Sequence, residues 1–222
     1  MSDSPPPQTL LTLPNIITLA RLVAVSSAAV YGSGHDGLIA EDATLTPYSP
    51  YGHHKRIMEE LCRSYAASYG LRVSIARLFS VFGAELKKQL LWDLCTRLAV
   101  DTRSIVLGGS GNELRDWTDV HDVVRALDLL ATQACDEVAV FNVGTGTGSS
   151  VRQIATGIAR HWLLPGAADA LQFSGQSRPG DPFSLVADAT GLNKLGFAWE
   201  ISVDNGLAAY VRWFKGQREF HQ

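Results

Sequence analysis

A short apolar segment, residues 21–27 (RLVAVSS), constrains the fold of this chain more than any other stretch. Its apolar residues follow one another almost without interruption, which is typical of a strand buried on both faces of a parallel sheet. Sheets of that kind occur in α/β folds, in which strands alternate with helices.

The rest of the sequence shows this alternation. Further strands are predicted at residues 71–78, 104–107 and 138–143, and helices at 9–20, 50–69, 86–100, 119–130, 151–162, 188–195 and 204–215. Ser49 and Ser150 suit the capping position of a helix, and Gly70 suits the residue that ends one. Residues 32–47 and 165–182 are predicted to be loops.

Composition limits the classes of function. The 222 residues are 46% hydrophobic and 18% charged, which suits one large core or one domain plus a small lobe. A formal net charge of -3 predicts no basic surface for nucleic acid. The three cysteines form no CxxC pair, so a reducing cytoplasm fits best.

The apolar stretch at residues 9–31 contains Pro14, Asn15 and Arg21 and lacks a basic flank, which predicts a buried helix and strand instead of a membrane span.

A group of residues suited to proton transfer follows the first strand. Tyr51 and Lys55 are four residues apart on a predicted helix, so they lie on one face of it. A serine at the end of a nearby strand, Ser26 or Ser27, would complete a Ser/Tyr/Lys site. The alternative is that the serines are satisfied polar groups at a strand end and that Tyr51 packs at the helix start.

Two glycine motifs imitate a dinucleotide fingerprint. Residues 32–37 (GSGHDG) spell GxGxxG, but no helix begins inside the motif to hold a pyrophosphate, so we expect a loop. Residues 144–148 (GTGTG) stand between a strand and a helix, and Asp169 follows near the spacing of a ribose-binding acid. We expect a tight turn there, with a phosphate site as the alternative.

Six short motifs follow one another along the chain, in the order SSAAVYG, SPYGHHK, RLFSVFG, RDWTDVHDV, FNVGTGTGSSV and SRPGDPFSLVAD. Together they resemble the extended short-chain dehydrogenase/reductases that act on nucleotide sugars, the epimerase/dehydratase group. The resemblance implies hydride transfer between a sugar carbon and NAD, a keto-sugar intermediate, and then epimerisation or loss of water. It covers residues 15–214.

The resemblance assigns the reacting groups. Tyr51 matches the acid and base that handles the proton of the sugar hydroxyl, and Ser27 matches the serine that binds the reacting oxygen. Lys55 matches the lysine that favours the phenolate by its charge and binds the nicotinamide ribose. The serine assignment stays open to Ser26, so the predicted cofactor contacts are Ser26, Tyr51 and Lys55.

The resemblance also places the substrate. Arg115, Arg178 and Asp181 match positions that hold the diphosphate and the nucleoside ribose, where the planar guanidinium suits a diphosphate. Ser80 stands where the family has an asparagine that contacts substrate. Lys87 and Lys88 are expected to be a solvated helix start, with phosphate contact as the alternative.

The family begins with a βαβαβ half that carries the glycine fingerprint, and this sequence has no counterpart of it. We therefore expect an incomplete Rossmann-like, doubly wound parallel sheet in residues 1–108. Residues 109–222 are expected to form mainly a small α/β substrate lobe, with 116–145 returning to the sheet. A truncated enzyme, a second polypeptide and a repacked N-terminal segment are the competing explanations.

The predicted activity is that of a nucleotide-sugar epimerase. A dehydratase, or an inactive binding protein, is the alternative. Dehydratases of the group usually carry an acidic pair just before the tyrosine or after the serine, and the residues after Ser27 here are Ala28 and Ala29. A homodimer through the YxxxK helix is expected, without nucleic acid or membrane partners. No metal site is expected, because Asp116, Asp119 and Asp122 are interpreted as cap and solvent-face residues, and the adjacent His53 and His54 point to different sides of their helix.

Overall fold

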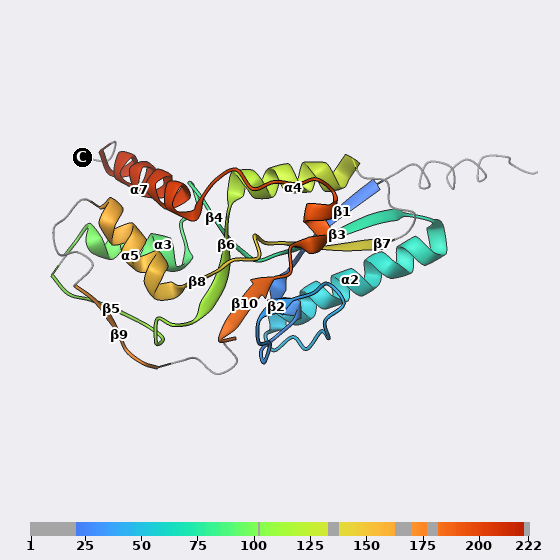
Figure 1. Ribbon diagram of the computed structural model, residues 1–222, viewed down its shortest axis with the longest axis horizontal. Coiled ribbons are helices and arrows are strands. Elements are labelled where there is room, and N and C mark those ends of the chain that lie inside the picture. Colours follow the sequence, from blue (N-terminus) through green and yellow to red (C-terminus); the bar gives the residue numbers. More distant parts are fainter. Residues whose placement is uncertain (1–20, 102, 133–137, 163–169, 177–181, 220–222) are drawn as a thin grey trace, which may run out of the picture.

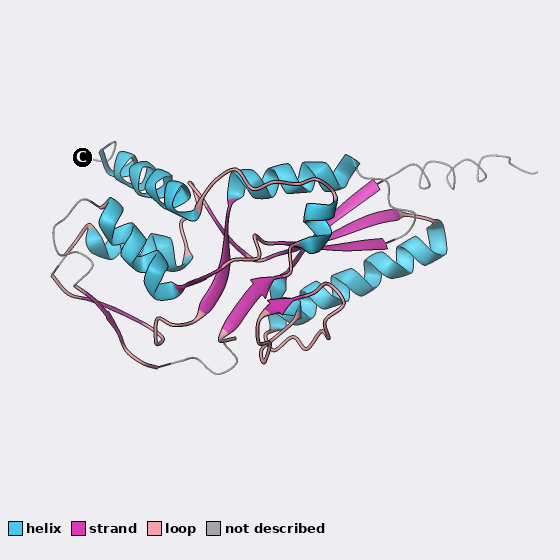
Figure 2. Cartoon of the chain, in the orientation of Figure 1, coloured by secondary structure: helices cyan, strands magenta, loops and turns pink. Residues whose placement is uncertain are grey.

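The computed structural model describes residues 21–101, 103–132, 138–162, 170–176 and 182–219, and their strands and helices alternate along the chain (Figures 1 and 2). The elements are β1 (Arg21–Ser27), the 3₁₀ turn η2 (Ala28–Val30), β2 (Leu38–Ile39), α2 (Pro50–Tyr69), β3 (Arg72–Leu78), β4 (Ser80–Phe82), α3 (Gln89–Leu98), β5 (Ile105–Leu107), β6 (Leu114–Asp119), α4 (Val120–Thr132), β7 (Val138–Val143), β8 (Gly148–Ser150), α5 (Val151–His161), β9 (Leu171–Phe173), β10 (Ser184–Ala187), α6 (Thr190–Lys194) and α7 (Val203–Glu219).

A three-stranded parallel sheet in the order β1-β3-β7 lies between α2 on one face and α4 on the other (Figure 1). Side chains alternate between the two faces, as the pleat requires. Val73 and Ile75 of β3 pack in the cluster that includes Cys62 of α2, whereas Ala76 packs with Ala126 of α4. The α/β class predicted from the apolar run is confirmed, but burial on both faces holds for the central strand β3 and not for β1. β1 is the edge strand of this sheet and leaves Leu22 and Val25 41% and 39% exposed, so the expectation of a fully buried strand at residues 21–27 was wrong.

A second sheet follows the order β2-β10-β6-β4, with β8 antiparallel to β6, and β5 pairs with β9 in a separate ribbon. The sequence did not predict β2, β4, β6, β8, β9 and β10. These strands have two to six residues, and β6 reads LRDWTD, so the apolar periodicity that signals a strand is missing. Two of these strands, at residues 38–39 and 171–173, lie in segments that were expected to be loops.

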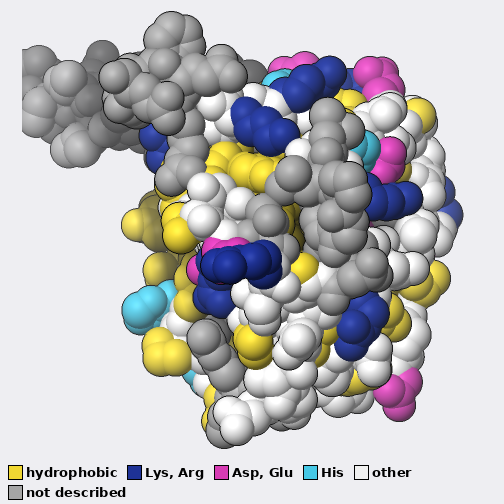
Figure 3. Space-filling view, turned by 90° about the vertical axis from the view of Figure 1, so that its left-hand side faces the viewer, with side chains coloured by type: hydrophobic (Ala, Val, Ile, Leu, Met, Phe, Trp, Pro, Cys, Tyr) yellow, Lys and Arg dark blue, Asp and Glu magenta, His cyan; other side chains and the backbone are white. Residues whose placement is uncertain are grey.

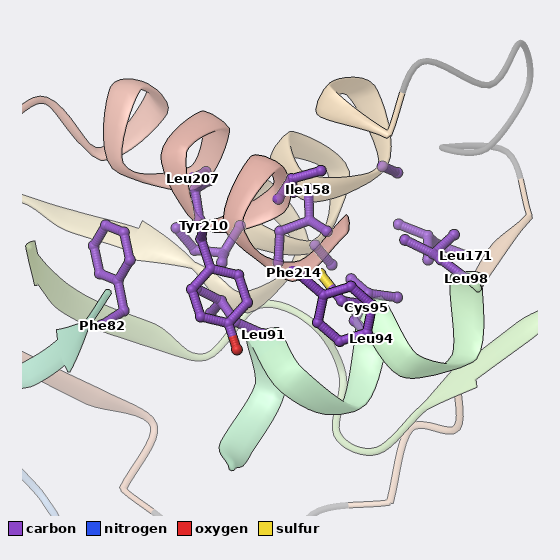
Figure 4. Close-up of a cluster of buried hydrophobic side chains, with 14 of the residues drawn as sticks. Phe82, Leu91, Leu94, Cys95, Leu98, Ile158, Leu171, Leu207, Tyr210 and Phe214 are labelled. Atoms are coloured by element: carbon purple, nitrogen blue, oxygen red, sulfur yellow. The ribbon is translucent and has the colours of Figure 1, made fainter. Parts of the chain in front are cut away.

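A large apolar cluster joins α3, α5 and α7 at the end of the molecule away from the three-stranded sheet (Figures 1 and 4). Leu94 of α3, Ile158 of α5 and Phe214 of α7 lie in it with exposed fractions of 3% or less. The hydroxyl of Tyr210 in this cluster donates to the carbonyl of Leu86 at 2.7 Å, which satisfies its one polar atom.

The predicted helix ends agree closely with the structure. Ser49 caps α2 by accepting a hydrogen bond from the amide of Gly52, and Gly70 ends the helix with a φ of 66°. Ser150 and Gln153 form a capping box at the start of α5. Helix α3 begins three residues later than expected, at Gln89. The helix predicted at residues 9–20 lies outside the described residues. Among the residues described, none of the helices has the length and apolarity needed to cross a membrane.

Candidate active site

The carboxyl end of β1 and the first turn of α2 meet at a cleft of about 740 Å³. Ser27, Tyr51 and Ser80 contribute to its wall, and the loop between β4 and α3 closes its far side. Tyr51 is 55% exposed, so its phenol stands where a ligand can reach it. The structure therefore brings together the predicted serine and tyrosine from segments more than 20 residues apart.

Lys55 lies one turn beyond Tyr51 on the same face of α2. Its Nζ donates to the carbonyl of Val25 at 2.8 Å and is 5.7 Å from the centroid of the Tyr51 ring. The ammonium charge is thus held between the end of β1 and the phenol. Lys55 therefore brings a positive charge close to the Tyr51 ring.

The two neighbouring serines have different environments. Ser26 is 1% exposed, and its hydroxyl donates to Oε1 of Glu59 at 2.6 Å. Ser27 is half-buried, and its Oγ accepts a hydrogen bond from the amide of Ala29 at 3.2 Å as the cap of η2. The Ser27 hydroxyl proton has no acceptor among the described residues, so Ser27 is the better candidate for binding a reacting oxygen, and Ser26 is already engaged.

Sequence reasoning missed a buried polar network directly behind the cleft. Glu59, Arg77, Tyr31 and Asn142 are each no more than 2% exposed. Arg77 forms two hydrogen bonds to the Glu59 carboxylate, at 2.9 and 2.7 Å, and donates to the Tyr31 hydroxyl at 2.9 Å, which in turn donates to Oδ1 of Asn142 at 2.6 Å. The available signal was Glu59, which falls four residues after Lys55 on the same helix face.

The network sets the protonation of its members. Burial alone would raise the pKa of Glu59, but the hydrogen bonds from Arg77 and Ser26 outweigh it, and the pKa lies below its ordinary value. Burial raises the pKa of Tyr31 despite the nearby Arg77. Tyr31 is therefore a neutral hydrogen-bonding residue, and Tyr51 is the tyrosine that faces the cleft.

The predicted substrate residues are only partly described. Ser80 lies in the main cleft, as does Lys88 at the start of α3. Arg115 lines a smaller hollow of about 230 Å³ with Tyr48 and Ser49, and its Nη1 donates to the carbonyl of Leu114 at 2.7 Å. Lys87 packs over the Trp92 ring at 6.0 Å from its centroid. The other two predicted residues, Arg178 and Asp181, lie outside the described residues.

The family model described as NAD dependent epimerase/dehydratase family matches residues 7–144, which include the end of β1, the YxxxK helix and Ser80. The chain belongs to this family. A dTDP-glucose 4,6-dehydratase from Streptomyces griseus is 31% identical over 217 residues, which are 96% of this chain and 64% of that protein. The recognition from six ordered motifs is thereby confirmed.

Solved structures of the epimerase/dehydratase family share the fold. MoeE5 in complex with UDP-glucose and NAD is 33% identical, with a TM-score of 0.78 over 89% of this chain and 66% of that one. A UDP-N-acetylglucosamine 4-epimerase from Methanobrevibacter ruminantium M1, in complex with UDP-N-acetylmuramic acid, is 26% identical. Its TM-score is 0.78, and the match covers 89% of this chain and 63% of that one. The chain spans about two thirds of the length of these relatives, which fits an incomplete Rossmann-like sheet.

The family is NAD-dependent, and the residues described fit one end of that cofactor. Of the predicted cofactor contacts, Ser26 and Tyr51 line the cleft, and Lys55 lies one turn beyond Tyr51. A pyrophosphate cradle is not found among the described residues, because residues 32–37 lead into β2 and not into a helix. In the second glycine motif, the amides of Thr145 and Gly146 donate to the carboxylate of Asp116 at 2.8 and 2.9 Å. An internal carboxylate thus already binds the amides that would hold a phosphate there, and the motif leads from β7 into the short strand β8 instead of turning directly into a helix.

The acidic residues of the RDWTDVHD motif are buried, with exposed fractions of 0% for Asp116, 5% for Asp119 and 0% for Asp122. The expectation that they include solvent-face residues was therefore wrong. Asp119 caps the start of α4 through the amide of His121, and Asp122 accepts from the amides of Glu200 and Ile201. Within the described ranges, His, Cys, Asp and Glu side chains form no group of three or more that suits a metal ion.

Proposed function

We propose that this chain carries the reacting groups of a nucleotide-sugar epimerase. The observation that carries the proposal is a cleft with Ser27 and Tyr51 in its wall and Lys55 one turn away. The serine is followed by Ala28 and Ala29, which bring no carboxylate to the segment. Elimination of water needs an additional acid and base, and alanine side chains supply neither.

The chain's residues divide the proton transfer between them. Tyr51, as phenolate, accepts the proton of the sugar hydroxyl while the carbon that bears this hydroxyl is oxidised. Ser27 donates its hydroxyl proton toward the same oxygen, and Lys55 stabilises the phenolate by its charge. NAD, when bound, supplies the hydride acceptor and donor. Return of the proton from Tyr51 completes the cycle, so one residue serves as base and then as acid.

A dehydratase of the same family is the second candidate, since the Streptomyces griseus relative has that name and 31% identity. An inactive nucleotide-sugar-binding protein is the third. Incubation of the chain with UDP-glucose or dTDP-glucose and NAD, followed by proton NMR, separates the three. The epimer of the supplied sugar supports the proposal and a 4-keto-6-deoxy sugar supports a dehydratase. Thermal stabilisation by the nucleotide sugar without product supports the binding protein.

Arg115 is proposed to bind the diphosphate of the substrate, and Arg115, Arg178 and Asp181 together are proposed to hold the diphosphate and the nucleoside ribose. Replacing Arg115 by Gln should weaken binding of UDP by about 10-fold or more, because a hydrogen bond to a charged group contributes roughly 1.5–3 kcal/mol. Calorimetric titration with UDP measures the change. Arg103→Gln is the matched control, since Arg103 is an exposed arginine that pairs with Asp101 on the surface. Equal UDP affinity in wild type and Arg115→Gln would refute the role.

The expected homodimer has a suitable surface on α2. Ile57, Leu61, Tyr65 and Tyr69 are spaced four residues apart and are each 52–57% exposed. A stripe of large apolar side chains on one helix face is typical of a protein interface. Leu61→Glu should therefore shift a dimer toward monomer in analytical ultracentrifugation. Val124→Glu, at a 59% exposed position of α4, should not. A monomeric wild type would contradict this proposal.

The remaining predictions are that the chain binds neither nucleic acid nor membranes and that it is located in the cytoplasm. On the face shown in Figure 3, Lys and Arg side chains form several separate groups instead of one continuous basic patch. This face therefore agrees with the expectation that a nucleic acid is not the partner. A cytoplasmic location and the lack of a membrane partner stay predictions.

A further inference from the structure

Glu59 lies on α2 one turn beyond Lys55 and about two turns beyond Tyr51, so the three side chains follow one another along one face of the helix. Tyr51 is 55% exposed at the cleft, whereas Glu59 is 0% exposed. The helix face that carries the reacting groups therefore runs from the cleft into the core.

The Glu59 carboxylate ties this face to β1. Its Oε1 accepts hydrogen bonds from the Ser26 hydroxyl at 2.6 Å and from Nε of Arg77 at 2.9 Å. One turn earlier on α2, Lys55 donates to the carbonyl of Val25 at 2.8 Å. Val25 and Ser26 directly precede Ser27, so two turns of α2 are bound to the strand end that supplies the serine.

Arg77 extends the link across the sheet. Besides its two bonds to Glu59, its Nη1 donates to the Tyr31 hydroxyl at 2.9 Å and to the carbonyl of Glu41 at 2.7 Å. The Tyr31 hydroxyl then donates to Asn142 on β7. A shift of α2 by one turn, 5.4 Å, would break the Glu59 contacts and leave charges buried without partners.

We propose that Glu59 is a positioning residue that fixes the first half of α2 on β1 and thereby sets the Tyr51 phenol against the Ser27 hydroxyl. Specifying one arrangement is the best-attested use of a buried charge pair, because its net contribution to stability is often small. The effect on catalysis rests on the proposed function of Tyr51, whereas the anchor itself does not.

Amide hydrogen exchange tests the anchor without any substrate. Glu59→Gln removes the charge at nearly constant shape, Ser26→Ala removes a single hydrogen bond, and Ile158→Val alters the separate core of α5 as a control. In Glu59→Gln and Ser26→Ala, amides of residues 53–59 should exchange at least about 10-fold faster relative to those of α5, because local opening governs their exchange. Unchanged protection of 53–59, or equal acceleration in α5, would overturn the proposal. If Glu59→Gln does not fold, Ser26→Ala alone decides.

Turnover tests the consequence for catalysis. Both variants should lower kcat at least about 10-fold with KM within twofold of wild type, while Ile158→Val keeps kcat. In a Tyr51→Phe background neither variant should lower the residual rate further, because residues that act as a unit are not additive. Lack of turnover by wild type would refute the proposed function and leave the exchange result to decide the anchor. An active wild type with unchanged kcat in both variants would refute the positioning role alone.

Discussion

Replacing Tyr51 by Phe should lower kcat for nucleotide-sugar turnover by about 10²-fold or more, with little change in nucleotide-sugar affinity. A positioned general acid and base contributes typically 10²–10⁴-fold to a rate, and phenylalanine retains the ring but not the proton. The phenol is 55% exposed at the cleft, so its loss leaves no buried polar group unsatisfied. Steady-state kinetics and calorimetric titration with the same nucleotide sugar measure the two quantities.

Tyr65→Phe is the matched control for this substitution. Tyr65 is 56% exposed on the same helix but lies more than three turns from the cleft. It should keep the wild-type kcat. A Tyr51→Phe variant that turns over substrate at the wild-type rate would show that the proton passes through another group.

Replacing Arg77 by Leu should have the largest effect on stability. The substitution leaves the buried carboxylate of Glu59 with only the Ser26 hydroxyl and the more exposed guanidinium of Arg63, 3.6 Å away, and breaking a buried pair costs about 3–5 kcal/mol in free energy of unfolding. Urea unfolding measures the loss. The double variant Glu59→Leu, Arg77→Leu should recover much of it, because no uncompensated charge remains in the core.

The difference in stability between wild type and Arg77→Leu should depend on pH through the charge of Glu59. In wild type the pKa of Glu59 lies below its ordinary value of 4.5, so its stabilising contribution is present above pH 4.5 and is lost as pH falls through the folded-state pKa. Without Arg77, burial is opposed only by the Ser26 hydrogen bond and the Arg63 charge, so the pKa of Glu59 rises relative to wild type and the carboxylate contributes less stability at neutral pH. The gap between wild type and variant should therefore narrow from pH 7 to pH 4. A constant gap would contradict a charged Glu59.

The three-stranded sheet β1-β3-β7 could be predicted from local signals, whereas the second sheet could not. The strand at 21–27 and the helix between Ser49 and Gly70 agree with β1 and α2 because their apolar spacing and capping residues agree. Strand β6 could not be predicted, because its buried Asp116 is satisfied by amides at positions 145, 146 and 187, far along the chain. A polar residue with distant partners looks like a loop residue in the sequence.

Some residues of the candidate site could be predicted from the sequence, and others could not. Tyr51 and Lys55 are recognisable from their spacing, and motif order assigns Ser27. The structure adds support for Ser27 over Ser26, because the Ser26 hydroxyl already donates to the carboxylate of Glu59, 33 residues away. Glu59 on α2 and Arg77 on β3 could not be predicted to be buried, because charged residues are almost never fully buried unless paired, and these two pair with each other in the core.

A crystal structure of this protein with UDP-glucose bound tests the central claim most directly. The account predicts the sugar in the cleft between β1 and α2, with the oxygen of its reacting hydroxyl about 2.6–3.2 Å from both the Tyr51 phenol and the Ser27 hydroxyl. It also predicts the diphosphate near Arg115. A sugar bound elsewhere, with Tyr51 and Ser27 out of reach of any sugar hydroxyl, would contradict the account.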